Sequence, residues 1–553
     1  MSSEKDVPVI IIGGGIVGLS ASNFLAHHGI HSMVVERHKG TSIHPRARSV
    51  NARTMELYRR LGIEQLVHDA GASISPSKGI YGGASLKEVI EPKSRSAGPR
   101  SMPWIGVLAP LSPVTGTFVT QDMIEPVLLD AAKGRGVDVR FDTECIDIEQ
   151  DDNSVSVVLK DRVTGVNSTV RGRYLIAADG AESPIRTRLK VPTTGRGTMG
   201  HLLNILFHAD LKPLVEGREF SLCRIERPEV RGLMTSINND DRWVFHLLYD
   251  PSKGEQPSDF PPEKCKELLR LALGIPDIEI EVKSILPWKP SVRIAEQLQH
   301  GHIFLAGDAA HQMPPWGGQG ANTGIADVHN LAWKLAAVLQ RHANESLLET
   351  YDVERIPVGK AAAEFSASNA DEDGIISAKG PFGLLLVIAK GFRLLSGHGI
   401  YYASRAICAE DTSPLGGLTW RPWTWPSLML AIDGRPGTRV PHLWVEHLGK
   451  RVSTLDLCGK TFVLFAGADG ISWVEAAKKV SLAMGVDIAA YRAGPDGCDL
   501  VSPKGSLESV AGISSRGAIL VRPDDFVAWR QRRQVSDHEA ELTKAIRQAL
   551  CLS

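Results

Sequence analysis

The order of apolar and polar positions near the start of the chain predicts a βαβ unit. Residues 7–12 form an apolar run rich in β-branched side chains, which is typical of a buried parallel strand. A glycine turn follows, then a helix over residues 16–28 that Gly29 would cap, and a second strand over residues 31–36. A strand, a helix and a strand within about 30 residues make one βαβ unit.

The rest of the first 190 residues carries shorter patterns. We predict helices over residues 51–61 and 122–133, a strand over 137–148, a hairpin of strands 154–160 and 167–173 around Thr164-Gly165, and a buried strand over 174–178. Residues 72–118 are rich in Gly, Ser and Pro and show little periodicity. We therefore predict loops and irregular excursions for that stretch.

The pattern changes between residues 190 and 290. Ile278, Ile280 and Val282 alternate with charged residues, and residues 242–249 form another strand pattern, which fits an antiparallel sheet with one face in water. Residues 302–306 then return to a buried strand, followed by a long helix over 323–339. This return indicates that residues 191–294 are inserted into a domain made of residues 1–190 and 295–375.

A third unit begins near Gly434. It alternates strands over residues 461–465 and 517–521 with helices over 473–484 and 536–549. We assign residues 431–553 to this domain and residues 376–430 to a linker that contains a short apolar helix and a Pro/Trp-rich stretch.

Composition excludes several classes of protein. The chain has 553 residues, of which 43% are hydrophobic and 23% are charged, and its formal net charge is -1. With so little net charge, we do not expect a protein that coats nucleic acid or binds an anionic membrane surface. The most apolar later run, residues 382–389, is far shorter than the roughly 20 residues that span a bilayer. The seven cysteines form no CxxC pair and no zinc-ligand spacing, which predicts reduced thiols, no metal site and a cytoplasmic location.

The glycine turn carries the first chemical motif. Gly13, Gly15 and Gly18 have the GxGxxG spacing, in which glycines permit a tight turn, close approach of a pyrophosphate and close packing of helix on strand. The N-terminus of the helix then offers unpaired N–H groups to the phosphates. Glu36 ends the next strand, where a carboxylate binds ribose hydroxyls, and Arg37 beside it is a further candidate contact. The unit alone leaves FAD and NAD(P) open.

Two later motifs narrow the choice. Asp179-Gly180 opens a loop that runs to Arg186, and Gly307-Asp308-Ala309-Ala310-His311 precedes a stretch from Pro314 to Asn322. In their order and spacing these motifs resemble the class A flavoprotein monooxygenases, the para-hydroxybenzoate hydroxylase-like family, over residues 7 to about 370. Segments 434–442, 453–457 and 517–524 resemble the thioredoxin-like C-terminal domain of the phenol hydroxylase and aromatic polyketide hydroxylase branch.

The resemblance implies an α/β and α+β fold. A Rossmann-like FAD-binding domain would carry an inserted antiparallel substrate sheet, and a thioredoxin-like domain without CxxC would follow. In this family an aspartate binds the ribityl chain, a loop and helix start meet the pyrimidine edge of the flavin, and an arginine after the second strand contacts FAD. The matching cofactor positions here are Arg46, Gln121, Asp179, Gly180, Asp308, Gly320, Ala321 and Asn322.

Neighbouring residues receive less definite roles. Arg186 would support the Asp179 loop or form a surface ion pair, and Arg48 would face flavin, substrate or solvent. Arg53 and Glu56 are expected to form structural pairs on their helix.

The implied reaction inserts one oxygen atom of O₂ into a phenolic or polycyclic aromatic, polyketide-like substrate. NADPH or NADH reduces FAD, and a C4a-hydroperoxide of the flavin transfers oxygen, so no catalytic triad or metal is required. His246 and Tyr249 are candidates to meet the substrate hydroxyl, although they cannot share one face of a regular strand. Pro315 and Trp316 would lie beside the flavin, with Trp288 and Arg293 as further substrate candidates.

Three alternatives stay open. Baeyer–Villiger oxygen insertion would use the same scaffold, a flavin dehydrogenase or oxidase would insert no oxygen, and a non-catalytic FAD-binding scaffold would use its C-terminal domain for partners. Beyond the small aromatic substrate and O₂, we expect neither nucleic acid nor a membrane span, and we leave a homodimer open.

Overall fold

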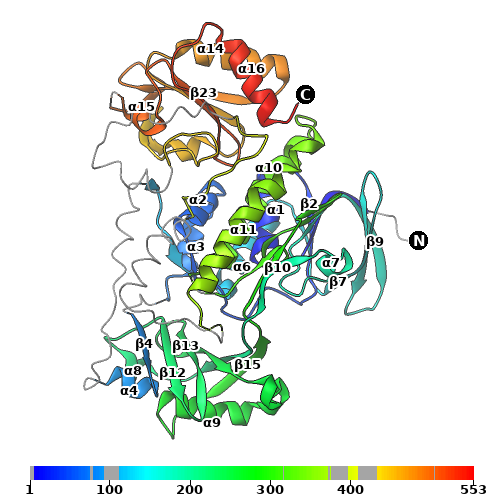
Figure 1. Cartoon of the computed structure of the whole chain (residues 1–553), viewed down its shortest axis with the longest axis vertical. Helices are drawn as coiled ribbons and strands as arrows, with labels where there is room; N and C mark the ends of the chain where they lie inside the picture. The colour runs from blue at the N-terminus through cyan, green and yellow to red at the C-terminus, as the bar shows by residue number, and fades with distance from the viewer. Residues whose placement is uncertain are drawn as a thin grey trace.

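The computed structural model has three bodies arranged along one long axis (Figure 1). It describes residues 5–74, 79–91, 111–315, 317–371, 374, 397–408, 432–503 and 505–552. The domain formed by residues 1–190 and 295–375, here called the central domain, lies in the middle, the inserted sheet domain at the bottom of the view and the C-terminal domain at the top. The predicted linker, residues 376–430, lies outside the described residues except for 397–408.

The central domain is built on a mainly parallel sheet with the order β17-β18-β9-β1-β2-β6. The predicted βαβ unit is confirmed, because β1 (Lys5–Ile12), α1 (Ile16–His27) and β2 (Ser32–Val35) follow one another and β1 pairs in parallel with β2. α1 packs against α6 (Gln121–Gly134) and the long α10 (Gln319–Leu339). The remaining strands of this path are β6 (Asp138–Arg140), β9 (Asn167–Ala177), β17 (Gln299–His300) and β18 (Ile303–Leu305).

Two predicted strand boundaries in this domain were wrong. Residues 137–148 form two strands, β6 and β7 (Thr143–Gln150), because Asp142 has φ 48° and turns the chain between them. The predicted strands 167–173 and 174–178 are one continuous strand, β9, which pairs with β8 (Val155–Asp161) at one end and with β1 along its length. Smaller elements complete the domain: β3 (Ser49–Val50), α2 (Ala52–Arg60), α3 (Glu64–Ala70), β5 (Thr117–Phe118), α7 (Pro184–Arg188) and α11 (Thr350–Ser368).

The inserted domain is a six-stranded sheet with the order β15-β11-β14-β13-β12-β4. Its antiparallel strands are β11 (Leu202–His208), β12 (Leu222–Arg227), β13 (Val230–Ser236), β14 (Arg242–Leu248) and β15 (Glu281–Trp288). α9 (Pro262–Leu273) covers the face away from the central domain, where Trp243, Phe245 and Leu247 form the core with it (Figure 1). β15 begins only at Glu281, so the predicted alternation from Ile278 starts before the strand.

The prediction of loops throughout residues 72–118 was wrong. β4 (Ile80–Gly83) pairs in parallel with β12, and α4 (Leu86–Ile90) buries Leu86, Val89 and Ile90 beside α8 (Lys212–Val215). A four-residue strand that contains two glycines has too little pattern to be seen alone, because its stability comes from its partner strand. The sheet domain therefore also contains β4 and α4, which precede the predicted boundary at residue 190.

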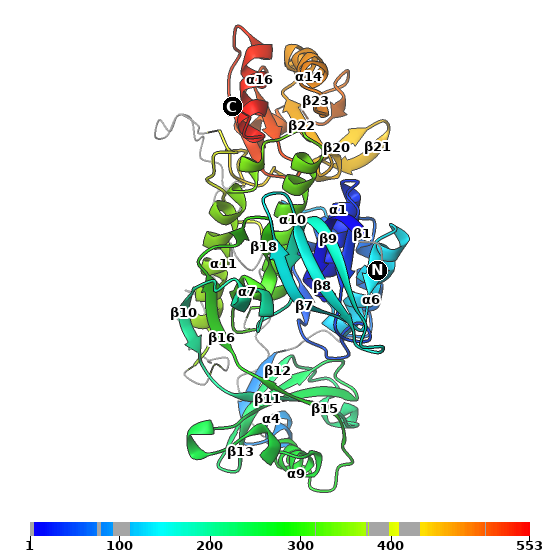
Figure 2. The same ribbon diagram turned by 90° about the vertical axis from the view of Figure 1, so that its right-hand side faces the viewer.

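A small three-stranded sheet connects the two domains. β10 (Thr193–Thr198), β16 (Ser291–Ala295) and β19 (His311–Gln312) pair in the order β10-β16-β19. Figure 2 shows β10 and β16 running from the central domain toward the inserted sheet. Since β19 directly follows the Gly307–Ala309 turn, this connection fixes the inserted sheet relative to the flavin motifs.

The C-terminal domain has the strand order of a thioredoxin-like fold. β22 (Phe462–Ala466) pairs in parallel with β23 (Ile488–Gly494) and antiparallel with β25 (Ala518–Val521), which pairs with β26 (Val527–Gln531). Its helices are α14 (Ile471–Met484), α15 (Ser506–Ala511) and α16 (His538–Ala549), and β20 (Trp444–His447), β21 (Lys450–Ser453) and β24 (Leu500–Val501) extend the sheet. All seven cysteines are free, and burial raises the pKa of Cys458.

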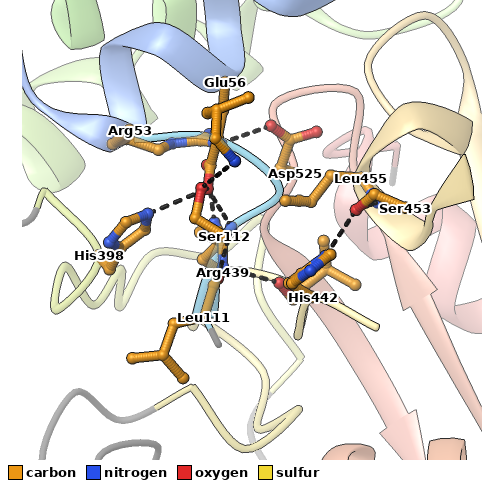
Figure 3. Close-up of polar contacts among 12 residues, drawn as sticks. Arg53, Glu56, Leu111, Ser112, His398, Arg439, His442, Ser453, Leu455 and Asp525 are labelled. Carbon is orange, nitrogen blue, oxygen red and sulfur yellow. Dashed lines mark hydrogen bonds and ion pairs between the residues drawn. The ribbon is translucent and has the colours of Figure 1, made fainter. Parts of the chain in front are cut away.

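Buried ion pairs join this domain to the central one (Figure 3). The Glu56 carboxylate on α2 accepts hydrogen bonds from Arg53, Ser112, His398 and Arg439, and Arg439 comes from the C-terminal domain. Burial would raise the pKa of Glu56, but the charges of Arg439, His398 and Arg53 outweigh that effect and hold it well below its usual value. Among the described residues, no helix is long and apolar enough to cross a membrane.

Candidate flavin and substrate site

The glycine turn has the geometry of a diphosphate site. Gly13 has φ 109°, and a Cβ there would lie 2.2 Å from the carbonyl oxygen of Ala178, so the turn requires glycine. A Cβ on Gly18 would lie 1.9 Å from the Gly13 oxygen, which explains the close packing of α1 on β1. Glu36 accepts a hydrogen bond from the backbone N–H of Gly14 at 2.7 Å. The carboxylate of Glu36 therefore lies against the backbone of the glycine turn, and its binding of a ribose stays a prediction.

Gln121 lies beside this turn, together with a residue that sequence reasoning missed. A Cβ on Gly15 would lie 3.9 Å from Nε2 of Gln121 and 3.5 Å from Oε1 of Glu125. Glu125 accepts hydrogen bonds from Gln121 at 2.5 Å and from the backbone N–H of Ser42 at 2.7 Å, and burial raises its pKa. The spacing of Gln121 and Glu125 on one helix face was the available signal.

The Asp179 loop and the Asp308 turn form one unit. Asp179 follows β9 and its Oδ1 is buried without a hydrogen-bond partner in the described chain, while Gly180 has φ 85° and open space where a Cβ would stand. Arg186 donates to the carbonyl oxygens of Ala181 at 2.7 Å and Ala309 at 3.0 Å. It therefore supports the loop rather than forming a surface ion pair.

Asp308 is exposed at the turn that follows β18. The surrounding protein nevertheless raises the pKa of its carboxyl group by desolvation, and the charges of His311, Arg46 and Arg186 partly offset that shift. Arg46 is exposed on the same side, and its backbone oxygen accepts a hydrogen bond from Gln121 N–H at 2.7 Å.

Asp327 is a second residue that the sequence analysis missed. Its Oδ2 accepts hydrogen bonds from the Gly307 N–H at 3.1 Å and from His311 Nε2 at 2.7 Å, and its Oδ1 accepts one from Arg355 Nε at 2.7 Å. This fully buried carboxylate fixes the backbone turn that presents Asp308. No sequence signature distinguishes it from other acidic residues of a helix.

The helix start at α10 differs in one detail from the prediction. The Asn322 side chain makes contacts within the protein: its Oδ1 accepts from Thr54 Oγ1 at 2.6 Å and from Asn51 N–H at 3.0 Å, and its amide donates to Gly318 O at 2.7 Å. Asn322 thus anchors α2, and its oxygen is not available to a ligand, whereas the first-turn backbone N–H groups of α10 have no partner within the helix. Trp316 lies outside the described residues, and Pro315 is exposed at the entrance to this turn.

His246 and Tyr249 lie on opposite faces of the inserted sheet. Tyr249 belongs to the core with α9, where its ring contacts Phe260, so packing is its role. His246 faces the FAD-binding domain, with Nδ1 2.6 Å from Asn204 Oδ1 and Nε2 3.1 Å from Thr235 Oγ1. Desolvation and the nearby charge of His44 lower its pKa to about 4, so the ring is neutral at physiological pH.

Of the remaining candidates, Trp288 lies near His246, with ring centroids 6.3 Å apart. Arg293 is on β16 and donates weakly to Thr198 at 3.4 Å. Arg37 is exposed beyond the end of β2. Arg48 is held in the segment that leads into β3, and all three of its side-chain nitrogens are buried with no hydrogen-bond partner among the described residues.

The comparisons with known proteins agree with this geometry. The FAD binding domain family model matches residues 6–366, and the model of the aromatic-ring hydroxylase C-terminal domain matches residues 433–551. The chain belongs to the FAD-binding aromatic-ring hydroxylases. It is an FAD-dependent aromatic monooxygenase with the class A fold.

Relatives of this hydroxylase span nearly its whole length. A putative polyketide hydroxylase of Streptomyces halstedii is 40% identical over 97% of this chain and 95% of its own, and the tetracenomycin A2 monooxygenase-dioxygenase of Streptomyces glaucescens is 37% identical over 99% and 97%. Among solved structures, the aklavinone-11 hydroxylase complex with FAD and aklavinone is similar with a TM-score of 0.84 at 34% identity, covering 100% of both chains.

The residues of this hydroxylase fit FAD. The unpartnered Asp179 Oδ1, the open space at Gly180 and the solvent-exposed Asp308 carboxylate are polar or permissive positions on two adjacent motifs. The glycine turn at α1 supplies N–H donors for a diphosphate. No group of His, Cys, Asp and Glu suited to a metal ion occurs in the part of the chain that the structure describes.

Proposed function

We propose that this hydroxylase adds one oxygen atom to a polycyclic, polyketide-like phenol in a pocket between the flavin motifs and the inserted sheet. The overall reaction would be ArH + O₂ + NAD(P)H + H⁺ → ArOH + NAD(P)⁺ + H₂O. One observation carries the substrate class: the sheet face toward the FAD-binding domain has a polar centre flanked by two apolar clusters. A flat, extended aromatic molecule with ring oxygens matches such a surface.

The two apolar clusters define the extent of this face. At one end Leu202 and Leu233 pack with partly buried neighbours that include Trp288, and at the other Leu206, Ile237 and Val244 pack against Met123 of α6. Between them lie Asn204, Thr235 and His246. Partly buried side chains of the two clusters, Trp288 and Met123 among them, would contact the ring faces, and the polar centre would orient one hydroxyl or carbonyl oxygen.

His246 would hold Asn204 and Thr235 in place at this polar centre rather than remove a proton. Because Asn204 Oδ1 is an acceptor, Nδ1 of the neutral ring carries the proton, and Nε2 accepts a hydrogen bond from the hydroxyl of Thr235. With a pKa of about 4, the ring is a weak base toward a phenol. Activation of the phenol therefore requires another group.

Each flavin motif would have a defined task. Gly13, Gly15 and α1 would bind the diphosphate, Glu36 the ribose, Asp308 the ribityl chain, and the N–H groups at the start of α10 the pyrimidine edge. Bound FAD would supply a hydride acceptor and, once reduced, the site of oxygen activation. The chain itself would exclude water and hold the aromatic ring against that site.

A screen under air tests the reaction. Hydroxylated anthraquinones and tetracyclic polyketides should stimulate NADPH oxidation and yield products that carry one ¹⁸O atom from ¹⁸O₂ as a hydroxyl. An ester oxygen would indicate Baeyer–Villiger insertion, whereas stoichiometric H₂O₂ without an oxygenated product would indicate an oxidase. Flavin that NAD(P)H cannot reduce would indicate a binding scaffold. NADPH or NADH as the reductant and a cytoplasmic location stay predictions, and a homodimer stays an open alternative.

A further inference from the structure

Arg48 carries a buried charge that nothing in the described chain neutralises. Its Nε, Nη1 and Nη2 atoms are all buried and lack hydrogen-bond partners within the described ranges. Desolvation lowers its pKa to about 10, and no carboxylate acts on it in the opposite direction. The guanidinium is therefore still charged at neutral pH. An isolated buried charge costs several kcal/mol, so proteins keep one only where a partner compensates it.

The backbone separates Arg48 from the arginine assigned to FAD. Ala47, between Arg46 and Arg48, has φ 46°, a left-handed conformation that is rare and costly for a residue with a Cβ. Arg46 acts electrostatically on Asp308, whereas Arg48 has no charged partner in the described ranges and lies against the Phe118 ring, 5.9 Å from its centroid. The strained turn thus directs two nearby cations to different surroundings.

Arg48 is also held close to the loop before α10. Its carbonyl oxygen accepts a hydrogen bond from Val119 N–H at 3.1 Å, and the following strand β3 pairs with β5. A Cβ on Gly318 would lie 3.5 Å from Ser49 Oγ, and Asn51 binds Asn322. The segment that carries Arg48 therefore borders the end of the site where the flavin ring is expected, and the diphosphate turn has its own donors.

We propose that Arg48 binds an anionic ring oxygen of the aromatic substrate, a phenolate or enolate, at this border. The proposal rests on the proposed function and adds the charge state of its substrate. A cation beside a phenol favours the ionised form, which is the better nucleophile, and so provides the activation that His246 cannot. The phenol proton is released to solvent on binding, and no further reactant is needed.

The guanidinium has planar N–H donors that suit two neighbouring oxygens. A ring with adjacent hydroxyl and carbonyl oxygens, as in hydroxyquinones, would satisfy more of its buried donors than a single hydroxyl. The Phe118 ring beside it would contact the aromatic plane. We therefore expect substrates with such an oxygen pair to bind best.

Alizarin, 1,2-dihydroxyanthraquinone, tests the proposal without turnover. Its visible absorption shifts to longer wavelength when a hydroxyl ionises, so a pH titration of the dye on the FAD-loaded oxidised enzyme reports the pKa of the bound dye. Wild type should lower that pKa by about 1 unit or more relative to free dye. Arg48→Met should abolish the shift, and Arg48→Lys should restore part of it. Arg227→Met, which removes a partly exposed arginine of β12 that pairs with Glu229, is the matched control and should behave as wild type.

Other outcomes overturn the proposal. No alizarin binding to wild type, or an unchanged pKa of the bound dye, would exclude an anionic aromatic ligand at Arg48. Lost FAD content in Arg48→Met would assign the cation to the cofactor, and a raised KM for NADPH with normal dye binding would assign it to the nucleotide phosphates. Arg48→Met should melt no lower than wild type, because it removes an uncompensated buried charge. If the pKa of bound alizarin is lowered but the enzyme oxygenates no aromatic compound, the proposed function is contradicted and the role of Arg48 is not.

Discussion

Arg439 of the C-terminal domain binds both carboxylate oxygens of Glu56 on α2, with Nε 3.0 Å from Oε2 and Nη2 in contact with Oε1 (Figure 3). α2 is also the helix whose N-terminal residues, Asn51 and Thr54, bind Asn322 at the start of α10. The thioredoxin-like domain is thereby connected through one helix to the loop that borders the flavin. We expect its role in this chain to be structural.

Loss of the Arg439 charge should destabilise the protein. In Arg439→Met the Glu56 carboxylate loses a buried partner, and removing one member of a buried pair costs about 3–5 kcal/mol. We expect a lower Tm and partial loss of FAD in thermal unfolding followed by flavin fluorescence. Arg435→Met is the control, because Arg435 pairs with Asp433 at the surface and should cost about 1 kcal/mol or less. Equal Tm values for the two variants would contradict the structural role.

Replacement of Asp327 should weaken FAD binding. Asp327→Asn removes the charge that faces Arg355 and weakens the acceptor of the Gly307 N–H, so the turn that presents Asp308 would loosen. We expect FAD affinity to fall about 10- to 100-fold, equivalent to about 1.4–2.8 kcal/mol. Equilibrium dialysis of the apoenzyme with FAD measures this. Asp161→Asn in the exposed hairpin turn should retain wild-type affinity.

Arg46 and Arg48 should separate cofactor binding from substrate binding. Arg46→Ala should lower FAD affinity about 10-fold, the effect of one charge-assisted hydrogen bond. Arg48→Met should leave FAD content unchanged. The ratio of flavin to protein after desalting checks both. Normal flavin content and turnover in Arg46→Ala would remove Arg46 from the cofactor site.

His246 and Tyr249 should differ in kinetics. His246→Gln should lower kcat/KM for the aromatic substrate about 10-fold through loss of one hydrogen bond, while NADPH reduces the flavin at the wild-type rate. Tyr249→Phe should change kcat/KM less than about 2-fold, because the phenol ring packs in the core. An ionisation near pH 6.5 that disappears from the profile of His246→Gln would contradict the neutral ring.

Stability should fall as the pH is lowered from about 6.5 toward 4. Burial lowers the pKa of His28 to about 3 and of His44 and His246 to about 4, so these rings stay neutral when folded but take up protons when unfolded below about 6.5. The unfolded state then binds more protons, and stability decreases by about 1.4 kcal/mol per pH unit for each such ring. Tm measured against pH should show this slope, and His28→Gln should reduce it.

The elements that could be predicted from the sequence are those whose cause is local. The βαβ unit follows from an apolar strand and from glycines whose Cβ would clash within the turn itself, as at Gly13 and Gly18. The Asp179 and Asp308 motifs likewise follow buried strands, β9 and β18, that are evident from composition.

What could not be predicted depends on distant partners. The amide oxygen of Asn322 accepts hydrogen bonds from Asn51 and Thr54, which lie 271 and 268 residues away in the chain. The same is true of Asp327, whose partners come from a turn and from α11. It is also true of Arg48, whose side-chain nitrogens are buried without a hydrogen-bond partner among the described residues. Such relationships follow from packing, which no periodicity records.

The pairing of β4 with β12 has a practical consequence for engineering chimaeras. An exchange of residues 191–294 alone between relatives would leave the recipient's own β4 and α4 against a foreign sheet edge. The segment to exchange is therefore discontinuous in sequence: residues 79–91 have to be exchanged together with the inserted sheet. We expect chimaeras with crossover points before residue 79, after residue 91, and at β10 and β16 to keep the whole inserted sheet intact and to take on the substrate preference of its donor.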